Sequence, residues 1–216
     1  MNRIGNKLLW GLMAFLAVGV AVFLIGQYAP GNPDRFFPQQ RLVYIAHKTG
    51  LMAHIFGAGI ALLIGPFQFL PAMRRKKYLG LHRWLGRLYL LGILVGGLSG
   101  LYMATFAHGG TVAQMGFAAL AVFWLTTGYF AYLRIRARDI QAHKRWMTRN
   151  FALTFAAVTL RLWLPILTLA VGLEFIHAYR IVAWLCWIPN FLLAEWIVRR
   201  RQHRLITRAL AGAAAD

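Results

Sequence analysis

The sequence predicts an all-α integral membrane protein, a six-helix transmembrane bundle with its N- and C-termini in the cytoplasm. Hydrophobic residues make up 60% of the 216 residues, above the roughly 45–50% of soluble domains. Six apolar runs are each long enough to cross a bilayer. The basic residues gather in short segments between alternate runs, which is typical of the loops of membrane proteins.

A helix needs about 20 mostly apolar residues to cross the hydrocarbon core, and it satisfies its own backbone polar groups there. The first apolar run also resembles a cleaved signal peptide, because Arg3 and Lys7 precede it. The run is long and no small-x-small cleavage site follows Gly26, so we expect it to be retained as an anchor. A single transmembrane domain over residues 1–216 is expected, with spans at about 8–25, 44–70, 85–107, 112–133, 151–173 and 181–198.

The orientation follows from the distribution of the 24 lysines and arginines. Nineteen lie on the side of the N-terminus, four lie on the other side, and Arg161 lies inside a span. Because positive charge favours the cytoplasmic side, we expect a multi-pass protein of a bacterial-type cytoplasmic (inner) membrane. On a soluble protein the net charge of +19 would suggest nucleic acid. In these loops it predicts contact with anionic lipid at the inner face instead, and no nucleic acid.

Small residues on the third span predict close helix packing. Gly92, Gly96 and Gly100 repeat every four residues, and the second span offers Ala58 and Gly59. Such spacing lets two helix backbones approach closely in lipid.

Four histidines form two candidate pairs, one near each membrane surface. His54 and His108 lie toward the outer surface, and His82 and His143 toward the inner surface. Paired imidazoles from different helices are the ligands of six-coordinate haem b, so we hypothesise two haem irons held by these residues. His47 shares a helix face with His54 and is an alternative outer ligand. Each histidine is also compatible with an interfacial role at a lipid surface.

Arg161 is the most informative single residue, because an unpaired cation at membrane depth is costly. It lies 11 residues past Asn150, about 16 Å deeper along a helix. A haem propionate, a bound anion or Glu174 are its candidate functional partners. Backbone carbonyls or Asn190 are the structural alternatives.

Three ordered segments resemble a bacterial family of predicted multi-spanning membrane proteins of unknown function. They are His54–Phe69, Leu81–Tyr89 and His143–Asn150. The resemblance covers about residues 44–170 and implies a membrane protein without supplying an activity.

The segment Leu81-His82-Arg83-Trp84-Leu85-Gly86 is similar to a second family, the transmembrane haem-b ascorbate-dependent ferrireductases. Their His-Ser-Trp-x-Gly motif begins a span and its histidine binds haem, which implies His82 as a ligand. Arg83 departs from that motif.

We therefore expect a small haem-b protein that moves electrons across or within the bilayer, a transmembrane oxidoreductase acting on quinone or ferric iron. Arg161 would neutralise a propionate. The alternative is a cofactor-free permease, or a lipid-interacting or accessory subunit of a membrane complex. In that case the same histidines and Arg161 would line a pathway for an anionic or amphipathic solute.

Overall fold

The computed structural model describes residues 3–213 and confirms the predicted all-helical membrane bundle. No strand occurs in that part of the chain, and six helical segments are long and apolar enough to cross a membrane. The fifth and sixth segments are each made of two helices. The segments are α1 (Arg3–Tyr28), α3 (Lys48–Gln68), α4 (Leu79–Ala104), α5 (Thr111–Arg136), α6 with α7 (Ile140–Thr154, Ala156–Pro165) and α8 with α9 (Phe175–Leu185, Ile188–Ala213).

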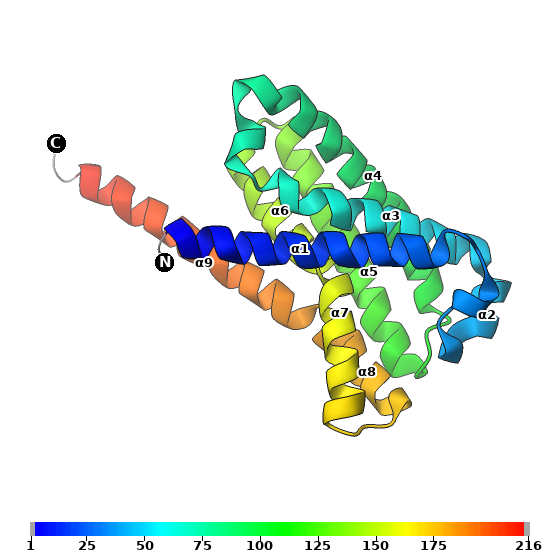
Figure 1. Ribbon diagram of the computed structural model, residues 1–216. Coiled ribbons are helices and arrows are strands. Elements are labelled where there is room, and N and C mark those ends of the chain that lie inside the picture. Colours follow the sequence, from blue (N-terminus) through cyan, green and yellow to red (C-terminus); the bar gives the residue numbers. More distant parts are fainter. Residues whose placement is uncertain (1–2, 214–216) are drawn as a thin grey trace.

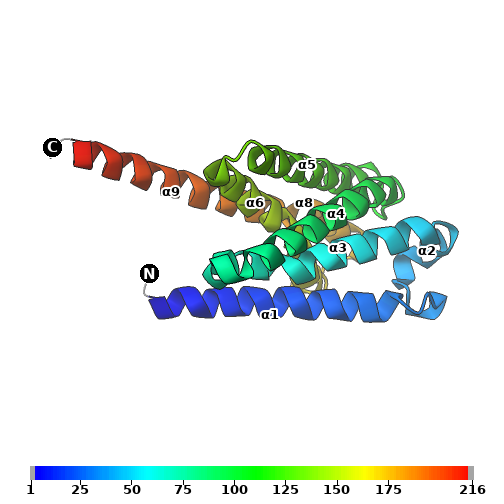
Figure 2. The ribbon, with the colours of Figure 1, turned by 90° about the horizontal axis from the view of Figure 1, so that it is seen from above.

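The helices follow one another across the bundle. In Figures 1 and 2, α1 lies at one edge beside α3, α4 crosses α3 closely, and α5 and α6 lie beyond α4. The start of α1 and the end of α9 lie at the same end of the molecule. This agrees with an even number of spans. The placement of both termini in the cytoplasm stays a prediction.

The helices extend beyond several of the expected spans. The fifth begins at Ile140 rather than near 151, where the Asp139 side chain accepts a hydrogen bond from the Ala142 backbone N–H at 2.9 Å. Hydropathy marks only the part of a helix in hydrocarbon, whereas a helix continues into the polar interface. The expected second span is interrupted at His47, which separates the short helix α2 (Arg41–Ala46) from α3.

The fifth and sixth segments are not straight. α6 gives way to α7 at Phe155, and a π-helix (Ile166–Ala170) follows Pro165. A second break at Cys186 and Trp187 precedes Pro189. Prolines and π-turns are common causes of such bends. Pro165 and Cys186, which lie at two of these interruptions, line the cavity described below.

The α3–α4 crossing rests on the predicted small residues. A Cβ atom added to Gly57 would lie 2.5 Å from the Gly96 backbone nitrogen, and one added to Gly92 would lie 2.7 Å from the Gly57 carbonyl oxygen. The two backbones are therefore in direct contact, as small-residue packing in membranes requires.

A buried hydrogen-bond network joins α4, α5 and α6. The Asn150 amide, which is fully buried, donates to the Trp124 carbonyl (2.8 Å) and to the Thr127 hydroxyl (2.9 Å). It accepts from the Tyr89 hydroxyl at 2.7 Å. The Thr154 hydroxyl accepts from the Trp124 indole N–H at 2.8 Å. A network whose members all find partners fixes the helix register in an apolar interior.

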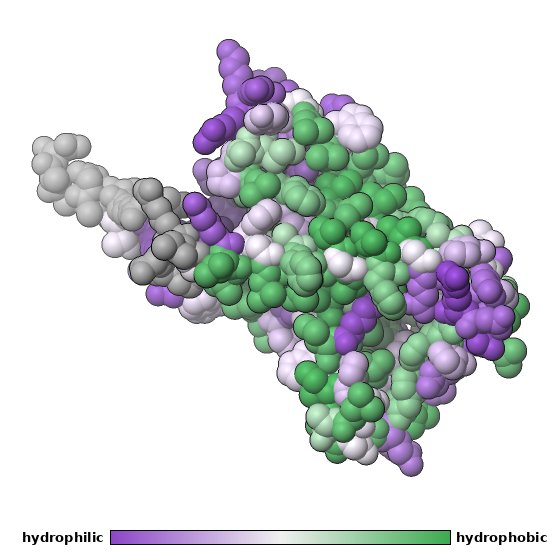
Figure 3. Space-filling view, viewed as in Figure 1, coloured by the Kyte–Doolittle hydropathy of each residue, from purple (hydrophilic) through white to green (hydrophobic). Residues whose placement is uncertain are grey.

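Apolar side chains cover the outside of the bundle. In Figure 3 the face containing α1 and α7 is largely hydrophobic, with a small hydrophilic spot between these helices and hydrophilic residues gathered at the ends. Phe15 of α1 is 74% exposed and Leu169 is 84% exposed. Such a surface suits contact with lipid tails, whereas soluble monomers rarely expose large contiguous apolar patches.

An ion pair connects α6 to α9 near the end of the bundle that carries the termini. The Glu195 carboxylate accepts from the Nε atoms of Arg149 and Arg199, both at 2.7 Å. We expect Glu195→Gln to lower the free energy of unfolding by about 1–2 kcal/mol, because Arg149 loses its carboxylate in a partly buried position. The midpoint of unfolding in SDS measures the change.

Asp34→Asn is the matched control for Glu195→Gln. It removes a carboxylate that lies 3.7 Å from Arg41 and is 83% exposed, so the effect should be smaller than about 0.5 kcal/mol. Equal effects of the two substitutions would show that the α6–α9 ion pair does not stabilise the bundle.

Candidate functional site

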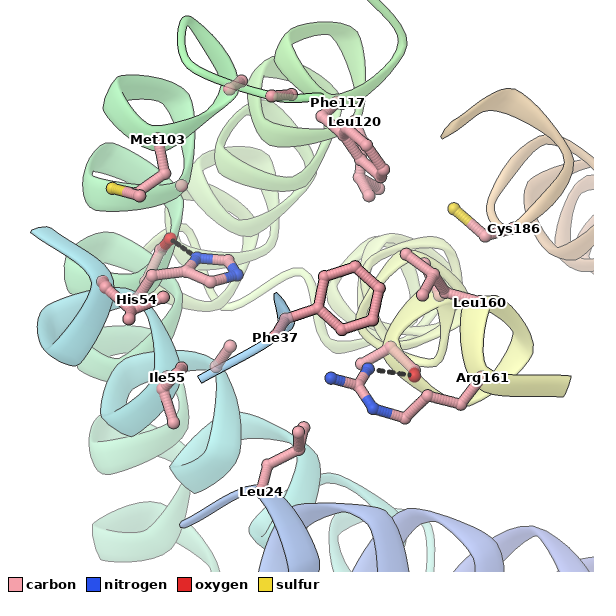
Figure 4. Close-up of a pocket in the computed structure, with 18 of the residues that line it drawn as sticks. Leu24, Phe37, His54, Ile55, Met103, Phe117, Leu120, Leu160, Arg161 and Cys186 are labelled. Carbon is pink, nitrogen blue, oxygen red and sulfur yellow. Dashed lines mark hydrogen bonds between the residues drawn. The ribbon is translucent and has the colours of Figure 1, made fainter. Parts of the chain in front are cut away.

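A cavity of about 410 Å³ lies in the half of the bundle away from the chain ends. Every spanning segment contributes to its wall, together with the loop that carries Phe37 and Gln40. Its volume falls in the usual range of about 300–1,000 Å³ for small-molecule sites. The bends of the fifth and sixth segments leave this space, and Figure 4 shows the side chains around it.

Arg161 supplies the positive charge of the cavity. It lies on α7, one turn before Pro165, and its guanidinium donates to the Ala157 carbonyl at 2.7 Å. No carboxylate lies within ion-pair distance of Arg161 in residues 3–213. Of the predicted structural partners, a backbone carbonyl is the one observed. Glu174 is exposed, and the Asn190 amide instead donates to the Thr159 hydroxyl and to two carbonyls.

Three tyrosines lie near Arg161, which places hydroxyl groups close to its charge. They are Tyr28, Tyr44 and Tyr179, and all three line the cavity. The Tyr179 hydroxyl accepts from the Gln40 amide at 2.8 Å, which leaves its own proton free to donate. Burial raises the pKa of the Tyr44 phenol well above its usual range, so Tyr44 is a neutral donor at physiological pH.

His54 projects into the cavity from α3, opposite Arg161 (Figure 4). Its Nδ1 atom lies 2.8 Å from the Gly96 carbonyl oxygen. A carbonyl only accepts, so Nδ1 carries the proton of the neutral ring and Nε2 keeps its lone pair. The missing side chain at Gly100 makes room for this ring, because a Cβ there would lie 2.7 Å from Nδ1.

The rest of the wall is apolar and partly aromatic. Phe117 and Leu120 come from α5 and Leu160 from α7. Phe37, from the segment between α1 and α2, lies between His54 and Arg161 in Figure 4. The thiol of Cys186, the only cysteine of the chain, also lines the cavity and is fully buried. A cavity with one cation, several hydroxyl donors and an apolar wall suits an amphipathic ligand.

The two predicted outer ligands, His54 and His108, lie in different surroundings. The cavity wall includes His54, whereas the His108 ring lies in the α4–α5 loop against Phe175 and Tyr179, at centroid distances of 5.5 and 6.2 Å. His47, the alternative ligand, stacks on Phe106 at 3.8 Å and bonds the Tyr102 hydroxyl at 2.7 Å.

The inner pair, His82 and His143, lies near the starts of α4 and α6. The Nδ1 atom of His143 donates to the Ala131 carbonyl at 2.9 Å, which leaves Nε2 free. The Nδ1 atom of His82 is buried and has no hydrogen-bond partner among the described residues. In the same part of the chain, no group of three or more His, Cys, Asp or Glu residues is placed to hold a metal ion.

Sequence reasoning identified His54 and Arg161 but missed the hydroxyl cluster. Gln40 and Tyr179 bond to each other across 139 positions of sequence. No local spacing relates them. The sequence offered only a weak signal for this cluster, because Gln40 and Tyr179 are polar residues in aromatic segments near the ends of apolar runs.

Comparison with known proteins places the chain in a family. A family model described as predicted membrane protein (DUF2306) matches residues 51–198, more than half of the chain. The chain belongs to this family. The match confirms the resemblance read from His54–Phe69, Leu81–Tyr89 and His143–Asn150, and the family carries no assigned activity. No curated protein and no solved structure matches, and the similarity to haem-b ferrireductases receives no support.

Proposed function

We propose that this member of the DUF2306 family binds a membrane-soluble amphipathic molecule in the cavity, through an anionic or carbonyl-type head group held by Arg161. This is the permease or lipid-interacting alternative of the sequence analysis, in a bacterial-type cytoplasmic membrane. One observation supports it above others: Arg161 lines the cavity at membrane depth and has no acidic partner within the described residues.

The lack of an acidic partner for Arg161 is informative because removing a guanidinium from water costs free energy. An isolated guanidinium in hydrocarbon costs several kcal/mol, and one local bond to the Ala157 carbonyl satisfies only one of its five N–H groups. The neighbouring hydroxyl groups of Tyr28, Tyr44 and Tyr179 add donors rather than negative charge. Arg161 therefore lacks an anionic partner, which a ligand head group would supply.

We expect decanoate to raise the melting temperature of the purified protein, because its carboxylate pairs with Arg161 while its chain fills the apolar wall. Decyltrimethylammonium, with the same chain length and opposite charge, should not do so. In Arg161→Met the decanoate effect should disappear. The ligand-free variant should be at least as stable as the wild type, because a partly buried charge without an acidic partner has been removed.

Arg35→Met is the matched control, since it removes one exposed arginine of the outer loop and should leave the decanoate shift unchanged. An equal shift in wild type and Arg161→Met would overturn the proposal. So would a shift produced equally by the cationic amphiphile.

The second candidate function is electron transfer through haem b at the inner pair, with quinone or ferric iron as the acceptor. It is favoured by the positions of His82 and His143 near the starts of α4 and α6 and by their free ring nitrogens. A histidine that ligates a metal commonly donates its other N–H to a carbonyl, as His143 does to Ala131. On this hypothesis His54 and His108 would hold an outer haem and Arg161 would pair with a propionate.

An absorption spectrum of the protein from haem-replete cells tests this second candidate. A Soret band with sharp bands after dithionite reduction, lost in His82→Ala and His143→Ala, is the result expected for bis-imidazole haem. His203→Ala, in the tail of α9, is the control and should leave the bands unchanged. A folded protein without a Soret band contradicts the haem hypothesis.

A further inference from the structure

We infer that the cavity selects quinol-type ligands over the corresponding quinones, with His54 accepting a hydrogen bond from one ring hydroxyl and Arg161 donating to the oxygen at the opposite side of the ring. The inference rests on the proposed function and specifies the ligand class and the role of His54.

The acceptor role of His54 follows from its fixed tautomer. The Gly96 carbonyl holds the Nδ1 proton at 2.8 Å, so the neutral ring presents only a lone pair at Nε2. No donor of residues 3–213 bonds to Nε2, and the close fit of the ring against Gly100 restricts its rotation. The ring nitrogen that faces the cavity in Figure 4 is therefore placed to accept a hydrogen bond from a ligand hydroxyl.

The opposite wall has the reverse polarity. Arg161 and the hydroxyl groups of Tyr28 and Tyr179 can all donate there, and Gln40 already occupies an acceptor site of Tyr179. A simple carboxylate would satisfy this wall but not His54. A ring with oxygens at both ends satisfies both walls when the oxygen nearer His54 is a hydroxyl.

The space between the two walls suits a flat ring with an apolar tail. Phe37, Phe117 and Trp124 are among the lining residues, and aromatic faces pack well on a ring. On the α1 side the wall is made by Phe23 and Leu24, next to the lipid-facing surface. A tail that leaves the cavity on this side would enter the bilayer.

The oxidation state of the ring then decides the affinity. The hydroxyl of a quinol donates a hydrogen bond to Nε2 of His54. A quinone instead places a carbonyl oxygen, which can only accept, against the lone pair of Nε2. One hydrogen bond gained or lost corresponds to about a tenfold difference in the dissociation constant.

Anaerobic calorimetric titration of the purified protein with decylubiquinol and decylubiquinone tests the inference, with decanoate titrated in parallel. We expect the quinol to bind about tenfold more tightly than the quinone. In His54→Gln, whose amide both donates and accepts, the ratio should fall toward one. His54→Phe should also abolish the preference for quinol, and it replaces His54→Gln as the test if the glutamine variant does not fold. His177→Gln, an exposed histidine outside the cavity wall, should keep the preference.

The outcomes separate the inference from the proposed function. The inference is overturned if quinol and quinone bind equally, or if the preference for quinol survives in both His54 variants. The proposed function still stands in either case if decanoate binding depends on Arg161. If decanoate binds but neither decylubiquinol nor decylubiquinone does, the inference is again overturned and the proposed function stands. Absence of binding by all three ligands overturns both.

Discussion

Substitution of Gly96 by leucine is expected to prevent the bundle from folding. A Cβ atom at this position would lie 2.7 Å from the backbone nitrogen of Ala58 and 3.1 Å from the carbonyl carbon of Gly57. These contacts involve backbone rather than a flexible side chain, so α3 and α4 must separate to admit any side chain. The loss should exceed about 3 kcal/mol, the upper part of the range for overpacked cores.

Size-exclusion chromatography and thermal melting of the detergent-purified variants measure this effect. Gly19→Leu is the matched control, because Gly19 lies inside α1, is exposed and has no atom near its Cβ position. Monodisperse Gly96→Leu protein with the melting temperature of the wild type would contradict the close α3–α4 contact. The same contact presents the Gly96 carbonyl to His54, so milder substitutions such as Gly96→Ala should also disturb the cavity.

Asn150→Leu is expected to lower the free energy of unfolding by about 2–3 kcal/mol. The substitution keeps the branch at Cγ but introduces a larger side chain. It removes two donated bonds, to Trp124 and Thr127, and one accepted from Tyr89. Individual interhelical hydrogen bonds in membranes contribute about 0.6 kcal/mol on average. Here one residue makes three, and its loss leaves buried partner groups unsatisfied.

Unfolding in SDS, followed by circular dichroism, provides the measurement for Asn150→Leu. Thr168→Val is the control, since the Thr168 hydroxyl bonds only to carbonyls of its own helical segment. If the two variants unfold at the same SDS fraction, the network does not hold α4, α5 and α6 together.

The sequence was sufficient for the bundle because membrane helices follow from one-dimensional properties. Apolar length locates the six spans, and the four-residue spacing of Gly92, Gly96 and Gly100 marks the face that contacts α3. The helix ends were less predictable. The extension of α6 back to Ile140 depends on an Asp139 cap and a basic interface that hydropathy does not score. The break at Phe155 contains no proline and has no sequence signal that we recognise.

Only the isolated charged and titratable residues of the candidate site could be predicted from the sequence. Arg161 stands out in sequence because a cation inside a span is rare, and His54 because it is a polar residue in an apolar run. Their placement on opposite walls of one cavity depends on the bends of α6–α7 and α8–α9. The position of His108 against Phe175 depends on the conformation of the α4–α5 loop. Both are tertiary features that residue spacing does not encode.

Native mass spectrometry tests the central claim, an Arg161-dependent ligand site, most directly. Wild-type and Arg161→Met proteins would be released from the same detergent after equilibration with decanoate. We predict one decanoate bound per wild-type chain, and the loss of that adduct in Arg161→Met while Arg35→Met retains it. Equal decanoate occupancy in all three proteins, or none in the folded wild type, would contradict the assignment of the cavity as a site for an amphipathic anion.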